Sequence, residues 1–152
     1  MNFGDSLSKI KAFLEKELID PISKRASSWI YDDDVRIDLD KSAYPKILLR
    51  ASETDLTKER LGLGHTSTID TYPLSIEIKA KLGEHYGLGT DKYTDKQFVS
   101  YIASQIESLI KSSHDDFVDD GFLHIIPISS KPSRDTDKNP IFTLRLEVKY
   151  QN

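Results

Sequence analysis

Two stretches of the chain place apolar residues at helical spacing, so that the apolar side chains of each stretch share one face. Their apolar positions are Leu7, Ile10, Phe13, Leu14 and Leu18 in the first, and Phe98, Ile102, Ile106, Leu109 and Ile110 in the second. Residues 94–97, just before the second stretch, have the Thr-x-x-Gln pattern of a capping box. Pro21 ends the first stretch, because proline lacks an N–H and clashes with the preceding turn. We predict an N-terminal helical segment over residues 1–30, with a second short piece at Ile22–Ile30, and a longer helix over 98–110.

Four other stretches have the pattern of β-strands. Residues 44–52 begin with Tyr-Pro, an order that favours extended backbone, and continue with an apolar centre. Residues 71–80 and 142–150 alternate apolar and polar positions, which indicates strands that are buried on one face. Residues 122–128 are mostly apolar, and Pro127 within them indicates that the strand lies at an edge or ends there, because proline cannot donate a hydrogen bond to a sheet.

These elements follow the order helix, strand, strand, helix, strand, strand. Helices that cover one face of an antiparallel sheet form a two-layer structure. We therefore predict a single α+β domain over residues 1–152, with a mainly antiparallel sheet of about four to five strands and two helices packed on one face. Residues 53–70 and 129–140 are polar and are predicted to be long loops. Val35–Asp40 alternates as well and fits either a short strand or an irregular arm.

Composition removes several classes of function. The chain has 152 residues, of which 38% are hydrophobic and 30% charged, and its formal net charge is −4. A negative protein is poorly suited to coat nucleic acid, because phosphate binding needs clustered lysine and arginine. The absence of cysteine excludes a disulfide scaffold, a cysteine zinc site and a thiol nucleophile. No apolar run approaches the ~18–20 residues that cross a bilayer. We expect no membrane association and no direct nucleic-acid readout.

Two acidic segments are candidate metal sites. A calcium loop counted from Asp32, the first of three consecutive aspartates, needs glycine at its sixth position and glutamate at its twelfth. The chain has Ile37 and Ala43 there. The second segment contains His114, Asp115, Asp116, Asp119 and Asp120. Because carboxylate runs are commonly solvated turns, we predict that both segments are solvated. A divalent ion held by Asp115, Asp116 and a histidine is the alternative.

Other catalytic patterns are absent from the sequence. The four histidines do not pair at the i, i+4 spacing of helical zinc sites. Leu61–Gly64 contains two glycines, but it lacks a Gly-Lys-Ser/Thr ending and precedes a strand, so we predict no nucleotide site there. No nucleophile elbow, kinase signature or dinucleotide fingerprint occurs. We expect a protein that is not an enzyme and that carries no cofactor or metal, with a small metal-dependent enzyme as the alternative.

The order of the elements is similar to that of a viral family. An amphipathic helix precedes Tyr44-Pro45-Lys46-Ile47, Pro73–Ile78 alternates and leads to the helix over 98–110, and the closing strand 142–150 carries a tyrosine near the C-terminus. This arrangement resembles the tail terminator, or tail-completion, proteins of long-tailed phages and related archaeal viruses, in which an aromatic-Pro-x-Ile/Val strand follows the first helix.

The resemblance implies a structural role in the virion tail or neck, with assembly in the host cytoplasm. Members of this family form a ring, usually a hexamer, that caps the tail tube and meets the neck and connector proteins. A ring of identical subunits needs a head-to-tail contact that closes by rotation. We expect that contact on the two long loops. The candidate interface residues are Lys58, Arg60 and His65 in the first loop, and Lys131, Arg134 and Asp137 in the second.

Two further interpretations remain open. The neck proteins that connect head and tail share a related plan, so the chain fits a head–tail connector as well as a terminator. A small cytoplasmic binding module is the other interpretation, because an exposed sheet edge can accept a strand from a partner.

Overall fold

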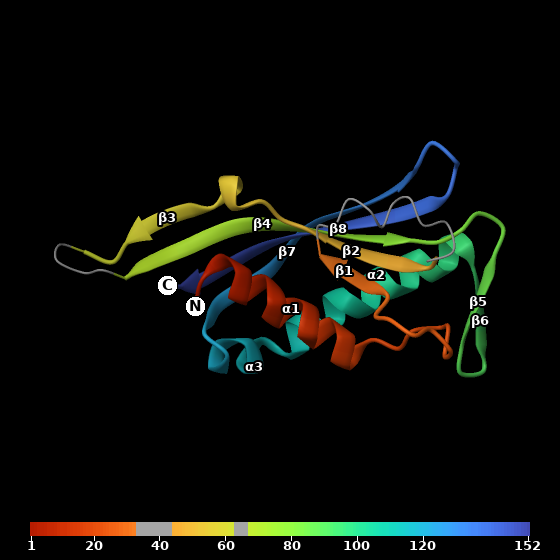
Figure 1. The fold of residues 1–152 in the computed structure, drawn as a ribbon, viewed down its shortest axis with the longest axis horizontal. Coiled ribbons are helices and arrows are strands. Elements are labelled where there is room, and N and C mark those ends of the chain that lie inside the picture. Colours follow the sequence, from red (N-terminus) through yellow and green to blue (C-terminus); the bar gives the residue numbers. More distant parts are fainter. Residues whose placement is uncertain (33–43, 63–66) are drawn as a thin grey trace.

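The computed structural model describes residues 1–32, 44–62 and 67–152 and has an α+β fold (Figure 1). In this part of the chain, three α-helices accompany a six-stranded sheet and a separate two-stranded hairpin. The helices are α1 (Phe3–Glu17), α2 (Asp95–Ser112) and α3 (His114–Asp119), and a short 3-10 helix, η3, spans Glu53–Asp55. The strands are β1 (Ile30–Asp32), β2 (Lys46–Arg50), β3 (Thr57–Arg60), β4 (Thr68–Lys79), β5 (His85–Leu88), β6 (Asp91–Thr94), β7 (Phe122–Arg134) and β8 (Pro140–Gln151).

The main sheet is mixed rather than antiparallel, and it has more strands than the sequence pattern predicted. Its order is β1-β2-β4-β8-β7, and β3 pairs with the outer part of β4. The pairs β2–β4, β4–β8 and β7–β8 are antiparallel, whereas β1 runs parallel to β2 with Ile30 opposite Ile47. Strand β1 has three residues, which are too few to show the alternation on which the prediction depended.

The predicted element order is also incomplete. The structure adds β1, β3, the β5–β6 hairpin and α3 to the six elements that the pattern indicated. Most of the added elements are short, and β3 is exposed along its whole length, so the hydrophobic pattern does not mark them. Val35–Asp40 lies outside the described residues.

Helix α1 begins at a reciprocal cap. The Asn2 side chain accepts a hydrogen bond from the Asp5 N–H at 2.8 Å, and the Asp5 carboxylate accepts one from the Asn2 N–H at 3.3 Å. The predicted helical piece over Ile22–Ile30 is wrong, since residues 18–29 form no helix. Asp20 organises this segment instead: its carboxylate accepts from the Ile22 N–H at 2.9 Å and pairs with the Arg25 guanidinium at 2.8 Å.

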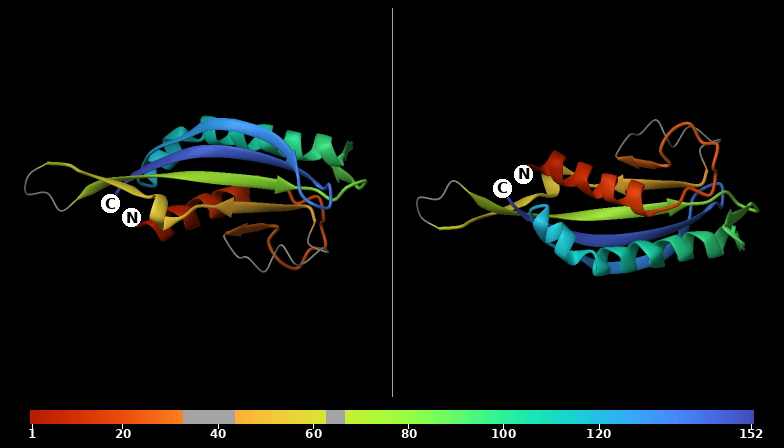
Figure 2. Two further views of the ribbon diagram at one scale, coloured as in Figure 1. Left: turned by 90° about the horizontal axis from the view of Figure 1, so that it is seen from above. Right: turned by 90° about the horizontal axis from the view of Figure 1, so that it is seen from below.

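One face of the central strands forms the core. Every second residue of β4 from Asp70 to Ile78 is buried, and the four core positions of β8 from Leu144 to Tyr150 alternate in the same way. Helices α1 and α2 bury their apolar faces in the same cluster as these strands. Figure 2 shows the helices in front of the strands when the molecule is seen from below. Each fully buried aliphatic or aromatic side chain contributes about 1.5–3 kcal/mol through the hydrophobic effect.

Buried tyrosines make the stability of the fold depend on pH in the alkaline range. Burial raises the pKa of Tyr72 and of Tyr86 to about 12, although a hydrogen bond with Ser6 opposes the shift at Tyr72. In the unfolded chain a tyrosine titrates near pH ~10. The neutral phenols therefore stabilise the fold fully below pH ~10, and this contribution is lost as the pH rises through about 12.

We accordingly expect the free energy of unfolding, measured with urea, to be level between pH 7 and pH 9 and to fall steeply above pH ~10. The variant Tyr72→Phe should weaken this dependence because one shifted group is gone. It should also lose about 1 kcal/mol at pH 7, since the 2.9 Å hydrogen bond between Tyr72 Oη and Ser6 Oγ disappears. A stability that stays constant up to pH 11.5 in the wild-type chain would contradict the expectation.

Candidate assembly surfaces

The β3–β4 hairpin forms an arm that extends beyond the helices. Strand β3 pairs antiparallel with the start of β4, from Thr57 opposite Thr71 to Arg60 opposite Thr68. All four residues of β3 are exposed. Figure 1 shows the arm at one end of the molecule, away from α2 and the β5–β6 hairpin. The prediction of a long loop over 53–70 is therefore wrong: η3, β3 and the start of β4 occupy most of this region. Backbone pairing, rather than burial of side chains, forms the arm.

A buried carboxylate ties the base of the arm to the body. Asp70 is fully buried and accepts hydrogen bonds from Thr68 Oγ1 at 2.6 Å and from Asn152 Nδ2 at 3.2 Å. Lys58 of β3 lies 3.9 Å from the same carboxylate. Burial, followed by the negative charge of Asp70, raises the pKa of the neighbouring Tyr150. Asp70 thus joins both strands of the arm to the C-terminal residue.

A second hairpin, β7–β8, extends from the other end of the sheet (Figure 1). The prediction of a loop over 129–140 is wrong, because β7 continues to Arg134 and β8 begins at Pro140. The residues Ser129–Arg134 pair with residues 140–145, yet most of their side chains are exposed. A strand that is solvated on both faces has no alternation of apolar and polar residues, and for this reason its sequence resembles a loop.

A single carboxylate organises the turn of this hairpin. Asp135 Oδ1 accepts from the N–H groups of Asp137 and Asn139 at 2.9 Å each, and Asp135 Oδ2 accepts from Asn139 Nδ2 at 3.0 Å. Lys138 adopts a φ of 65°. Asn139 in turn accepts from the Leu82 N–H at 2.9 Å, so the hairpin is tied to the end of β4. Asp135 and Asn139 were not predicted as structural residues, although an aspartate followed by polar residues is a signal for a side-chain-to-backbone turn.

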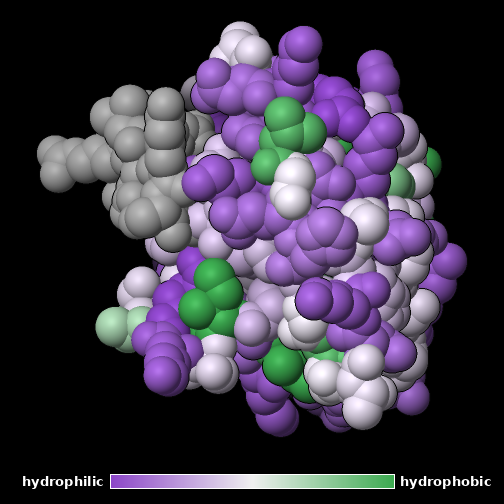
Figure 3. Space-filling model, turned by 90° about the vertical axis from the view of Figure 1, so that its right-hand side faces the viewer, coloured by the Kyte–Doolittle hydropathy of each residue, from purple (hydrophilic) through white to green (hydrophobic). Residues whose placement is uncertain are grey.

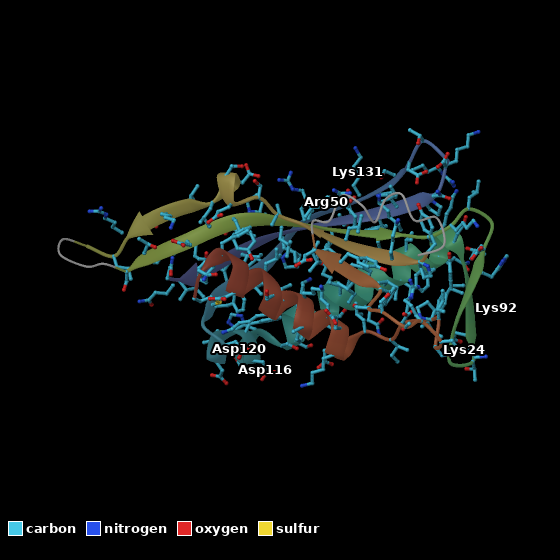
Figure 4. The ribbon with its side chains drawn as sticks, viewed as in Figure 1. Lys24, Arg50, Lys92, Asp116, Asp120 and Lys131 are labelled. Atoms are coloured by element: carbon cyan, nitrogen blue, oxygen red, sulfur yellow. The ribbon has the colours of Figure 1, made fainter. Side chains whose placement is uncertain are left out.

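The structure places five of the six predicted interface residues on these two hairpins. Arg60 and Lys58 are both exposed on β3, and Lys58 lies beside Asp70. Lys131 is exposed on β7, while Arg134 Nη1 donates to the Lys138 carbonyl at 2.7 Å and so supports the turn that exposes Asp137. His65 lies outside the described residues. The two groups are on opposite parts of the molecule and do not form one site (Figures 1 and 4).

The acidic segment around α3 does not gather metal ligands. Asp115, Asp116, Asp119 and Asp120 are exposed, and His114 is exposed beside them. Within residues 1–32, 44–62 and 67–152, no group of three or more histidine, aspartate or glutamate side chains is arranged to hold a metal ion. The imidazole of His124, in β7, instead lies 2.8 Å from the Glu147 carboxylate of β8.

A shallow, open groove that was not predicted from the sequence crosses the exposed face of α2. A hollow of about 710 Å³ lies between α2 and β6, and one of about 600 Å³ lies between α2 and the β7–β8 hairpin. The lining of both hollows includes Lys96 and Ser100, so they meet on the helix. The rings of Tyr93 and Tyr101 stack beside the first hollow, with centroids 4.7 Å apart. Residues from three separate segments form this groove, and no local sequence pattern could have marked it.

None of the helices in the described part of the chain is long and apolar enough to span a membrane. No protein-family model and no curated protein sequence matches this chain.

Proposed function

We propose that this chain is the subunit of a homo-oligomeric ring that caps a viral tail tube and joins it to the head or neck, as a tail terminator does. The observation that carries the proposal is the position of two polar hairpins, β3–β4 and β7–β8, at opposite ends of one sheet. A closed ring needs two different surfaces on each subunit, because the contact is head-to-tail. Two projections at opposite ends supply such surfaces.

The exposed side chains of these hairpins support a contact between polar surfaces. Lys58, Glu59 and Arg60 alternate in charge along β3, and Lys131, Arg134 and Asp137 provide both signs on the second hairpin. Mixed charges at an interface fix register and discourage wrong partners more than they add affinity. Figure 3 views the end of the molecule that carries the β5–β6 hairpin, where hydrophobic residues appear only as small patches among hydrophilic ones. A mostly hydrophilic surface of this kind is expected of subunits that stay apart when dilute and assemble only at high local concentration.

The same geometry would suit a head–tail connector of the neck. The protein that the ring binds distinguishes a connector from a tail terminator. A terminator binds the end of a tail tube, whereas a connector binds the portal side of the neck. A metal-dependent enzyme has less support, because the exposed carboxylates of α3 converge on no common point in the described residues.

Native mass measured across a concentration series, with negative-stain images of the most concentrated sample, tests this proposal. We expect closed rings of about six subunits. Arg60→Glu, at the exposed arm, should shift assembly to higher concentration, while Lys24→Glu is a control with the same change of charge on an exposed loop outside both hairpins. A chain that stays monomeric, or that forms only two-fold dimers, at every concentration would contradict the proposed function.

A further inference from the structure

The groove on α2 has the chemistry of a site for an acidic helix. Three cations line it, namely Lys92, Lys96 and Arg134, against one lining carboxylate, that of Asp91. The carboxylate of Asp95, at the start of α2, also lies near Arg134 and Lys96 and leaves an excess of one positive charge. The chain as a whole has a net charge of −4, so this concentration of positive charge is local. All three cationic side chains belong to exposed residues. No ion pair within the described residues involves Lys92 or Lys96.

Small side chains on the floor of the groove also favour a helix as its occupant. Ser100 and Ser104 are exposed, line the hollow beside β6 and lie one helical turn apart on α2. Small side chains in this position let another backbone approach closely. The stacked rings of Tyr93 and Tyr101 stand on one side, and Pro132, Pro140 and Phe142 line the other hollow. The groove therefore offers apolar walls around a polar floor, with cations at several points along it.

The opposite end of α2 leads to a segment that complements this groove. Residues 115–120, in α3 and just after it, include four exposed aspartates, and Val118 among them is 47% exposed. At ~1.5 Å rise per residue, the eighteen positions from Lys96 to His114 place the cationic end of the groove roughly 27 Å along α2 from the start of α3. Figure 4 shows Asp116 and Asp120 on α3, well apart from Lys92, which lies at the end of the molecule that carries the β5–β6 hairpin. One copy therefore cannot place its own α3 in its own groove.

We infer that the groove on α2 binds the α3 segment of a second copy of this chain. The aspartates of α3 would face Lys92, Lys96 and Arg134, and Val118 would lie against the tyrosine rings. The contact is heterologous, since the groove and α3 are different surfaces, and repetition of a heterologous contact produces a ring if the rotation closes. This inference rests on the proposed ring and adds a second contact, between α2 and α3, to the contact that the proposed function places on the two hairpins.

A charge-swap experiment on the full chain tests the inference. One variant, Lys92→Glu with Lys96→Glu, reverses the groove, and a second, Asp116→Lys with Asp120→Lys, reverses the α3 segment. A third variant carries all four substitutions. The control, Lys16→Glu with Lys24→Glu, makes the same change of net charge as the groove variant on exposed residues outside the groove. Self-association is measured by native mass at low and high ionic strength, and the melting temperature of each variant confirms that it is folded.

We expect each of the two reversals to raise the dissociation constant by at least about tenfold, and the four-fold variant and the control to assemble as the wild-type chain does. The wild-type contact should weaken at high salt, because exposed charges are screened. The groove contact would be overturned if the reversals left self-association unchanged, or if the variant with all four substitutions failed to recover self-association. In either case, rings in the wild-type sample would still support the proposed function. Open chains that respond to the swap would support the groove and contradict the ring, and a monomeric wild-type chain would contradict both.

Discussion

Replacing Phe98 with alanine is expected to lower the free energy of unfolding by about 3–5 kcal/mol, the range found when a large core aromatic is truncated. Phe98 is fully buried at the start of α2. Its ring lies 4.7 Å from that of Tyr86 and 6.2 Å from that of Trp29, measured between centroids. Phe98 thereby joins α2 to the β5–β6 hairpin and to the segment before β1. Truncation removes apolar burial and leaves a cavity among these three segments.

Urea unfolding of Phe98→Ala measures this loss, and Tyr101→Ala is the matched control on the same helix. Tyr101 is 38% exposed and stacks on Tyr93, so its truncation should cost only about 1 kcal/mol. Because the groove is formed between α2 and its neighbouring hairpins, Phe98→Ala should also reduce self-association through the groove. Equal losses of stability in the two variants would show that Phe98 does not anchor the helix.

Replacing Asp70 with alanine is expected to lower the free energy of unfolding by about 2–3 kcal/mol, because hydrogen bonds to a charged group are stronger than those between neutral groups. The substitution leaves the Asn152 amide and the Lys58 ammonium without their carboxylate partner at the base of the arm. Hydrogen exchange of the β3 amides should accelerate more than that of the buried part of β4, since the arm has few apolar contacts of its own.

Asp70→Asn separates the charge of this side chain from its shape, and we expect its loss of stability to be intermediate. Asp55→Ala, at an exposed residue of η3, is the control and should change the free energy by less than about 0.5 kcal/mol. An Asp70→Ala variant as stable as Asp55→Ala would mean that solvent replaces the carboxylate without cost.

Elements that bury one face could be predicted from the sequence. The alternation over 71–80 and 142–150 corresponds to β4 and β8, and the capping box before α2 is present, with Thr94 Oγ1 accepting from the Gln97 N–H at 3.4 Å. The prediction of an edge strand from Pro127 is confirmed, since β7 ends the sheet. In each case the signal was burial or a local hydrogen bond, and both are encoded in neighbouring residues.

Elements that depend on backbone pairing alone escaped prediction. Strand β3 and the outer half of β7 are exposed, so their sequences resemble loops even though both are paired. The candidate site divides in the same way. Exposed charged residues such as Arg60 and Lys131 could be named as candidates because they lie in polar segments. Asp70 and Asp135 could not, because the fold determines which hydrogen-bond partners lie beside them. The groove required three segments to meet and so had no sequence signature.

The irregular shape of β7 has a consequence for how copies of this chain can meet. An unpaired edge strand of thirteen residues would ordinarily be a template on which other chains add and aggregate. Two register shifts bend this edge, and Pro127 and Pro132 lack the N–H that an added strand would need. The charge of Lys131 disfavours the approach of another strand, because pairing would remove it from water. We therefore expect concentrated solutions of the chain to resist fibril formation, because the edge strand β7 cannot accept a continuous row of strands from other chains.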